Sequence, residues 1–230
     1  VPLSDFKRTN VKMAGDSKLT DRLKISGTAT FSNSLNNLAQ KGSNLSAVMV
    51  GLMRNTPTFD LTNGSGDPVN DPAAYMYADG TQRMYYSGYD NPYWSVNKNK
   101  ANAQVNRIIG NTQIDYKLFP WLSAMYRLGI DYYTEKRSSF FDNNSSDTPN
   151  GYVTASTYTF SGINSDLVLS FEKDLSKNLK LNVVAGHNYY EKNTYNNSQR
   201  GDSLVLPNFY DLSNTAVTSG DDSKTAYKIV

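Results

Sequence analysis

The sequence predicts an all-β chain: a segment of an antiparallel transmembrane β-barrel, with about six to seven strands of a larger barrel and long extracellular loops. Apolar residues recur at every second position in several separate stretches, which is the period of a strand. The connectors between these stretches alternate between short and long, as periplasmic turns and extracellular loops do in outer-membrane barrels. A soluble antiparallel sheet alternates too, so the pattern favours a barrel and leaves the soluble sheet open.

The alternation is clearest in residues 122–133, where Leu122 and Leu128 fall on one face and Arg127 and Asp131 on the other. This window also fits a helical stripe, but similar stretches elsewhere fit only a strand, because a helix would place Ser26, Thr30 and Asn182 among apolar residues. The expected strands are residues 6–14, 22–33, 104–118, 122–135, 163–174 and 178–192, with a seventh beginning at Tyr227.

The connectors pair these strands into hairpins. The short ones read "GDSKLTDRL", "LFPWLS" and "KDLSKNLK", and the long ones cover residues 34–103, 136–160 and 192–224. The first long loop contains "GSNLSAVMVGLMRN", whose apolar residues have helical spacing, so we expect a short helix at 43–55 with Ser43 as N-cap.

Aromatic residues mark both ends of the expected strands. Phe119 and Trp121 lie at a short turn, and Tyr132, Tyr133, Tyr189 and Tyr190 lie toward the long loops. Amphipathic rings favour the membrane–water interface, so these positions are expected to form the two aromatic girdles of a barrel.

Composition excludes several kinds of site. The 230 residues carry a net charge of +2, which implies no nucleic-acid partner. There is no cysteine and a single histidine, His187, so thiolate metal sites, a Ser-His-Asp triad and a multi-histidine zinc site are not expected. No long apolar run suggests a membrane-spanning helix. We expect no enzyme activity and no cofactor.

The first long loop carries the candidate binding residues. Its segment "RMYYSGYDNPYW" combines aromatic rings, which stack on ligands, with polar groups that hydrogen-bond them. The same residues would serve a protein partner equally well, and packing within the loop is the favoured alternative. The candidates for substrate or partner binding are Arg83, Tyr85, Tyr86, Tyr89, Asp90, Asn91 and Trp94.

Other polar residues have simpler interpretations. Arg127 and Asp131 are expected to face the lumen, in ion pairs with each other or with neighbouring strands. His187 falls on the lipid-facing phase near the end of a strand. Two acidic stretches could supply calcium ligands, but both are good turn sequences and are expected to form turns: Asp67, Asn70 and Asp71, and Asp142, Asn143, Asn144 and Asp147.

Five segments resemble the SusC/RagA family of TonB-dependent outer-membrane transporters from Bacteroidota. The resemblance covers nearly the whole chain, in order. The segments are "QKGSNLSAVMVGLMRNTPTFDLTNG" (40–64), "DNPYWSVNKN" (90–99), "VNRIIGNTQIDYKLFPWLSAMYRLGIDYYTEKR" (105–137), "NSDLVLSFEKDLSKNLKLNVVAGHNYYEKN" (164–193) and "LPNFYDLSN" (206–214).

The resemblance implies a barrel of about 22 strands around an N-terminal plug, of which residues 1–230 would form an early-to-middle part without the plug or the TonB box. It also implies import of oligosaccharides or peptides across the outer membrane of a Gram-negative cell. The implied partners are a SusD-like surface lipoprotein, TonB through a segment not in this chain, the rest of the barrel, outer-membrane lipid, and a second transporter–lipoprotein pair.

The alternative function is a soluble β-sandwich that binds glycans through its loop aromatics. The two readings differ in the environment of the apolar face, which a barrel exposes and a sandwich buries against a second sheet. The residues that decide between them are Leu122, Tyr126, Leu128, Leu167, Leu169, Leu179, Leu181 and Val183.

Overall fold

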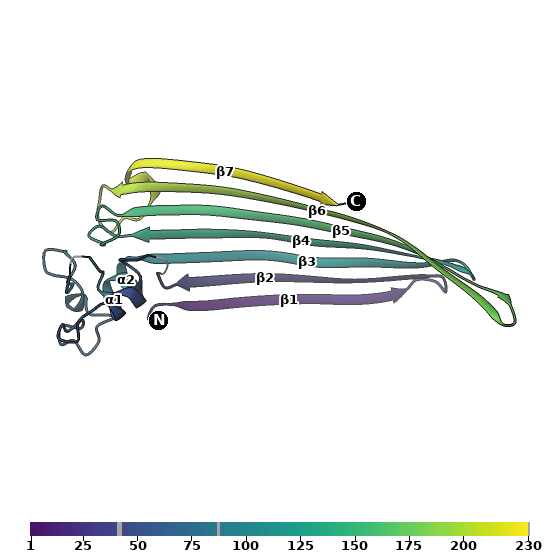
Figure 1. Ribbon diagram of the computed structural model, residues 1–230, viewed down its shortest axis with the longest axis horizontal. Helices are drawn as coiled ribbons and strands as arrows, with labels where there is room; N and C mark the ends of the chain where they lie inside the picture. The colour runs from purple at the N-terminus through teal and green to yellow at the C-terminus, as the bar shows by residue number, and fades with distance from the viewer. Residues whose placement is uncertain (41–42, 87, 230) are drawn as a thin grey trace.

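The computed structural model describes residues 1–40, 43–86 and 88–229. They form one seven-stranded antiparallel sheet in which each strand pairs with the next along the chain, so that β1 and β7 are its two edges (Figure 1). The strands are β1 (Asp5–Lys18), β2 (Leu23–Leu38), β3 (Lys100–Phe119), β4 (Leu122–Phe141), β5 (Tyr152–Ser176), β6 (Leu179–Leu204) and β7 (Thr215–Ile229).

Short and long connectors lie at opposite ends of the sheet. The short turns join β1 to β2, β3 to β4 and β5 to β6, and the long loops gather at the other end with the two helices (Figure 1). The all-β class, the antiparallel pairing and the three predicted hairpins are therefore confirmed. No helix in the described part of the chain is long and apolar enough to cross a membrane.

The strands extend beyond their predicted limits at the loop end. β5 begins at Tyr152, β6 continues to Leu204 and β7 begins at Thr215, so the predictions of 163, 192 and Tyr227 are wrong. The added part of β6, "NTYNNSQRGD" (193–202), is polar apart from Tyr195. The added part of β5 carries Tyr152, Tyr158 and Phe160 on the polar face, so neither segment continues the alternation of the apolar stretches.

The register gives the sheet one apolar face and one polar face. Tyr126 of β4 is paired with Ile114 of β3 and Leu167 of β5, while the next residue, Arg127, is paired with Gln113 and Asp166 on the other face. Tyr126, Leu128, Leu167, Leu169, Leu179, Leu181 and Val183 are 39–56% exposed, and Leu122 is partly exposed. Since the described residues form one sheet with no second sheet packed on it, the sandwich reading does not describe this chain.

The aromatic positions divide between the two faces. Phe119 and Trp121 stack with ring centroids 5.0 Å apart at the turn end, and Trp121 contacts Phe171 at 5.3 Å. At the loop end Tyr132 and Tyr189 lie on the apolar face, but Tyr133 and Tyr190 lie on the polar face, because adjacent residues of a strand alternate. The prediction that all four tyrosines belong to the aromatic girdle at the loop end is therefore wrong for Tyr133 and Tyr190.

The loop between β2 and β3 folds into a small compact unit at the loop end of the sheet, which we call the cap. It contains α1 (Val48–Met53), η1 (Pro72–Ala74) and α2 (Pro92–Lys98). The predicted helix at 43–55 exists but is shorter. Ser43 does not cap it, because its hydroxyl accepts hydrogen bonds from the amides of Leu45 and Ser46 in a preceding turn, and Ala47 is the N-cap residue.

Candidate functional site

The cap is built around Trp94 of α2. Trp94 is 1% exposed and packs with Tyr75 and Ala74, and its indole Nε1 donates to Ser145 Oγ at 3.0 Å. Ser145 lies in the loop between β4 and β5, so this hydrogen bond joins two loops that are about 50 residues apart in sequence. Burial also raises the pKa of Tyr75, with the Asp71 carboxylate as the smaller cause.

A buried carboxylate strengthens the same junction. Asp90 is 2% exposed, and its Oδ1 accepts from Gln82 Nε2 at 3.0 Å and from the Ser146 amide at 2.6 Å. Its Oδ2 accepts from Asn99 Nδ2 at 3.0 Å. The carboxylate is thus satisfied by neutral donors from both loops, which is how a buried charge is tolerated without a cation beside it.

Asn91 fixes the start of α2. Its Oδ1 accepts from the Tyr93 amide at 2.9 Å as an N-cap, and its Nδ2 donates to the Arg83 carbonyl at 3.0 Å. The polar groups of Asn91 are therefore bonded within the cap, those of Asp90 and Trp94 also bond the β4–β5 loop, and all three side chains are buried. Their position makes them supports for the cap surface.

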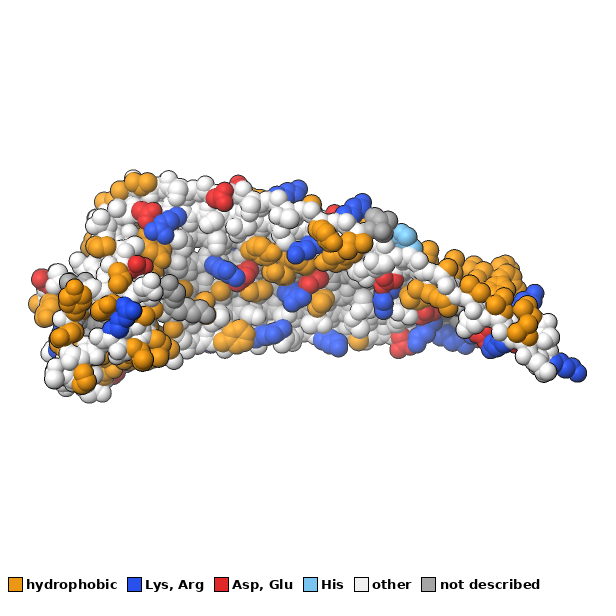
Figure 2. Space-filling model, viewed as in Figure 1, with side chains coloured by type: hydrophobic (Ala, Val, Ile, Leu, Met, Phe, Trp, Pro, Cys, Tyr) orange, Lys and Arg blue, Asp and Glu red, His pale blue; other side chains and the backbone are white. Residues whose placement is uncertain are grey.

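The remaining predicted residues reach the surface. Tyr85 and Tyr86 are 57% and 61% exposed. Tyr86 lies against Tyr89 with centroids 6.0 Å apart, and Arg54 covers the Tyr89 ring at 4.9 Å while donating to its hydroxyl at 3.0 Å. We call Arg54, Tyr85, Tyr86 and Tyr89 the cap patch; Figure 2 shows hydrophobic side chains gathered over this loop end.

The cap patch is a surface rather than a cleft. The pocket between its residues has a volume of about 10 Å³, which is the space of one water molecule. Arg83 lies below it, over the Phe59 ring at 4.7 Å, and donates to the Asp60 carbonyl at 2.6 Å. Ligand contact at the patch would therefore be by stacking on exposed rings, with Arg83 holding the loop beneath.

The third long loop is tied to the others by one lysine. Lys98 Nζ lies 3.1 Å from Asp142 Oδ2 and 2.7 Å from Asn208 Oδ1. Nearby, Tyr210 stacks on Phe140 at 3.9 Å, and its burial, with Asp142 as the second cause, raises the pKa of the Tyr210 hydroxyl. The loops at this end therefore form one packed layer.

Both acidic stretches form turns, as predicted. Asp67 accepts from Asn70 Nδ2 at 2.9 Å, and Asp71 caps η1 through the Ala73 amide at 3.0 Å. Asn144 has a positive φ of 72° in the second turn, a conformation that asparagine tolerates. No group of three or more metal-ligating side chains occurs within residues 1–40, 43–86 and 88–229.

The polar face of the sheet carries the second candidate site. Arg127 and Asp131 lie on it as predicted, but each pairs with a neighbouring strand and not with the other. Arg107 Nη2 lies 2.6 Å from Asp131 Oδ2, and Arg127 Nη2 lies 2.9 Å from Asp166 Oδ2. These ion pairs cross β3–β4 and β4–β5, so they link adjacent strands.

An aromatic cluster adjoins these pairs. Tyr133 stacks on Phe160 at 5.0 Å and contacts Tyr158 at 5.8 Å, with the Arg107 guanidinium 5.7 Å from the Tyr133 ring. Gly162 makes room for the Phe160 ring, because a Cβ there would lie 3.1 Å from its Cε1. A hollow of about 380 Å³ lies beside this cluster, lined in part by Arg127, Asp131, Phe160, Asn164 and Tyr190.

Sequence reasoning missed Tyr158, Phe160 and Arg107 at this site. The first two fell in the predicted loop 136–160, although Tyr152, Tyr158 and Phe160 already share one parity in "YVTASTYTF". Arg107 directly precedes Ile108 in the strand, so the alternation puts it on the opposite face, but its partner on the next strand depends on register, which the sequence does not reveal.

His187 lies on the predicted face but not near the end of a strand, because β6 continues from Leu179 to Leu204. It is exposed and shares the apolar face with Leu167, its partner across the β5–β6 pair.

Solved structures with the same fold are peptide transporters. The chain is similar to a solved structure of the RagAB peptide transporter, with a TM-score of 0.67 and 14% sequence identity. The match covers 98% of this chain and 25% of that chain. The RagAB importer structures in the "closed-closed" and "open-open" states give a TM-score of 0.66, at 14% and 16% identity.

These likenesses establish the fold, and the chain spans a quarter of the length of the solved chains it matches. No family model matches the sequence. No curated protein matches it either.

Proposed function

We propose that this chain is a wall segment of a SusC-like, TonB-dependent importer of the outer membrane that takes up peptides or oligosaccharides and has no catalytic role. The apolar face of the sheet would contact lipid and the polar face would line the lumen. The fold likeness to RagAB peptide importer structures supports this assignment, and since those proteins carry peptides, it favours a peptide as cargo.

The observation that carries the proposal is the height of the apolar band. On β4 the band extends from Leu122 to Tyr132, ten residue steps, or about 34 Å along the strand. With the strand tilt of about 40° usual in membrane barrels, this corresponds to a band about 25 Å high, which matches the lipid-facing band of outer-membrane barrels. Within it Tyr126, Ile130 and Tyr132 are 40%, 45% and 47% exposed.

The polar face fits a water-filled lumen. Arg107 and Arg127 on this face are paired with carboxylates at 2.6 and 2.9 Å, and their side chains remain 43% and 49% exposed. Such pairs stay hydrated in a lumen, whereas on the lipid face a charge would cost about 2–4 kcal/mol near the bilayer midplane.

The sheet requires further strands to close. Its edge strands β1 and β7 are not paired with each other, and the Leu179–Tyr189 part of β6 has no β7 partner among the described residues. In lipid these unpaired groups need partners. We therefore propose the rest of the barrel, TonB acting through another segment, a SusD-like lipoprotein over the cap, and a pair of such complexes.

Within the cap, Tyr85 and Tyr86 are the proposed contacts for cargo or for the lipoprotein. The test is uptake of labelled peptides and of labelled oligosaccharides by cells producing the full-length protein, compared with a Y85A/Y86A variant. Loss of two aromatic contacts should lower uptake of the true cargo about tenfold.

Tyr77→Ala is the matched control, because Tyr77 is 53% exposed in the same loop and lies outside the cap patch. An equal loss in this control would show that any cap substitution is harmful and would remove the assignment to the patch. Membrane fractionation tests the class itself: recovery of the full-length protein from the aqueous fraction would refute the transporter proposal.

A further inference from the structure

The outward face of the sheet changes character above its apolar band. Four residues beyond Tyr132 on β4, one rung of cross-strand partners extends from β1 to β7. Its side chains lie on the same face as Tyr132, since strand parity is preserved. The rung consists of Lys7, Leu35, Gln104, Lys136, Thr157, Asn197 and Asp222, and the Asp222 carboxylate accepts a hydrogen bond from Asn197 Nδ2.

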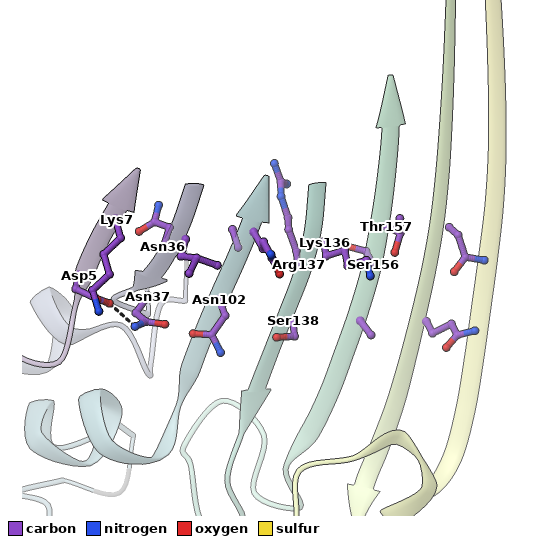
Figure 3. Close-up of a pocket in the computed structure, with 16 residues that line it drawn as sticks. Asp5, Lys7, Asn36, Asn37, Asn102, Lys136, Arg137, Ser138, Ser156 and Thr157 are labelled. Atoms are coloured by element: carbon purple, nitrogen blue, oxygen red, sulfur yellow. Dashed lines mark hydrogen bonds and ion pairs between the residues drawn. The ribbon is translucent and has the colours of Figure 1, made fainter. Parts of the chain in front are cut away.

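The next rung, toward the loops, contributes Asp5, Asn37, Asn102, Ser138, Ala155 and Gln199 to the same surface. The two rungs enclose a shallow hollow of about 510 Å³, which we call the outer-face trough (Figure 3). It spans most of the sheet, about 24 Å across at the usual strand spacing. A surface of this size fits a sugar headgroup rather than a single ion.

The trough is rich in groups that bond sugar hydroxyls and acidic substituents. Gln104 and Lys136 are direct cross-strand partners, and both are exposed. Lys136 forms no ion pair with any described residue, and Lys7 has only a loose contact with Asp5 at 3.5 Å, with its side chain 77% exposed. Amides and hydroxyls flank these two cations on every adjoining strand.

The height of the trough places it at the membrane surface if the apolar band lies in lipid. Its first rung is about 14 Å along the strand beyond Tyr132, which is about 10 Å along the membrane normal at the usual tilt. The headgroup region begins directly above the hydrocarbon core. Side chains at this height on the outward face would therefore meet lipid headgroups.

We infer that the outer-face trough binds the headgroup of an anionic glycolipid of the outer leaflet, its acidic group at Lys136 and Lys7 and its sugar hydroxyls at Gln104 and the neighbouring amides. The inference rests on the proposed function, because it needs the apolar face to be embedded. Basic pockets at headgroup height are the usual recognition sites for acidic lipids.

The composition argues against a second protein as the occupant. The centres of protein–protein interfaces are enriched in aromatic side chains and methionine, whereas the two rungs hold neither and offer only Leu35 and Ala155 as apolar side chains. The continuity of the trough with the apolar band, on the same face and strands, also favours a molecule that extends from acyl chains into sugars.

The experiment compares lipid retention by the full-length protein, extracted from outer membranes in mild detergent and analysed by native mass spectrometry for bound lipopolysaccharide. The test variant is K136A/Q104A. One exposed charge contact and one hydrogen bond are each worth about two- to fivefold, so retention should fall about tenfold. Lys136→Arg keeps the cation and should retain the lipid.

The matched control is K117A/Q113A, which removes the same residue types from the polar face of β3. It should retain lipopolysaccharide as the unmodified protein does. Equal retention in all four proteins, or equal loss in the control, would overturn the inference. A trough variant that instead dissociates a complex of two copies would also overturn it, in favour of a protein interface.

Two checks separate the possible failures. Circular dichroism of each variant establishes that the sheet is intact; if K136A/Q104A does not fold, Lys136→Glu is measured in its place, since it changes one exposed side chain. Protein that never enters the membrane fraction would refute the proposed function, whereas embedded protein with unchanged lipid retention would refute the trough alone.

Discussion

Replacing Asp90 by Asn should weaken the junction between the long β2–β3 loop and the β4–β5 loop while leaving the sheet intact. Asp90 accepts hydrogen bonds from Gln82 and from the Ser146 amide at Oδ1, and from Asn99 Nδ2 at Oδ2. An asparagine has one acceptor oxygen and one donor amide in these two places. In either orientation, at least one buried donor would face another donor.

The free-energy cost of this substitution depends on whether the Asn99 side-chain amide can rotate to restore its hydrogen bonds. Its Oδ1 already accepts from the Asp142 amide at 3.1 Å and from Ser145 Oγ at 2.8 Å, so rotating the Asn99 amide would break two bonds to save one. The less costly arrangement leaves Asn99 Nδ2 without an acceptor. A buried donor left unsatisfied costs about 1–3 kcal/mol, which raises the opening constant of the junction about five- to 150-fold.

Amide hydrogen exchange reports this opening directly. In the full-length protein, the Ser146 amide should exchange faster by that factor in D90N, and the amides of the paired β3–β4 strands should not change. Asp79→Asn is the control, because Asp79 bonds only to Thr81 within its own exposed turn. Unchanged exchange at Ser146 in D90N would refute the reasoning that this carboxylate joins the loops.

Two further predictions concern the lumen pairs and the cap turns. A double-mutant cycle on Arg107→Ala and Asp131→Ala should give a coupling energy of about 0.2–1 kcal/mol in denaturant unfolding, since both groups are partly solvated; a coupling of zero would mean that the pair does not stabilise the sheet. The hydroxyl and amide of Thr62 and the amide of Gly64 donate to Asp60 and lower the pKa of its carboxyl. A carboxyl whose folded pKa is depressed stabilises above its unfolded value of about 3.9, so protection of the Gly64 amide should be present at neutral pH and lost on acidification below about pH 4. Asp60→Asn should abolish this pH dependence, and persistence of the dependence in that variant would assign it to another group.

The part of the fold that the sequence predicts is the part set by the apolar band. Leu122, Tyr126 and Leu128 share a face whichever solvent they meet, and a slip of one residue would invert every side chain. The hairpins follow because their turns are too short for any connection other than an antiparallel one. These constraints are local, so they can be inferred without knowing which strand lies beside which.

The cap could not be predicted in the same way. In sequence, Asp90, Asn91 and Trp94 look like ligand-binding groups on a polar loop. Trp94 and Asp90 are hydrogen-bonded to Ser145 and Ser146, which lie more than 50 residues away in a segment that reads as an ordinary turn, and Asn91 bonds the carbonyl of Leu61 elsewhere in its own loop. Tyr85 and Tyr86 have the same residue chemistry but remain exposed, and no local signal separates them from the buried set.

The sequence does not predict the outer ends of the strands, and the physical reason for this also explains the polar trough. β6 has 26 residues and would reach about 88 Å if fully extended, whereas ten residue steps cover the apolar band. Beyond the band neither face is expected to meet hydrocarbon, so neither face needs apolar side chains and the alternation that predicts a strand disappears. Backbone pairing alone continues the sheet there, and the outward face is left free to carry amides, hydroxyls and lysines such as Lys136. A membrane-embedded sheet with strands longer than its apolar band therefore acquires a polar outward surface at headgroup height. In this chain that surface carries Lys136, which has no ion pair among the described residues, and Lys7, which lies 3.5 Å from Asp5.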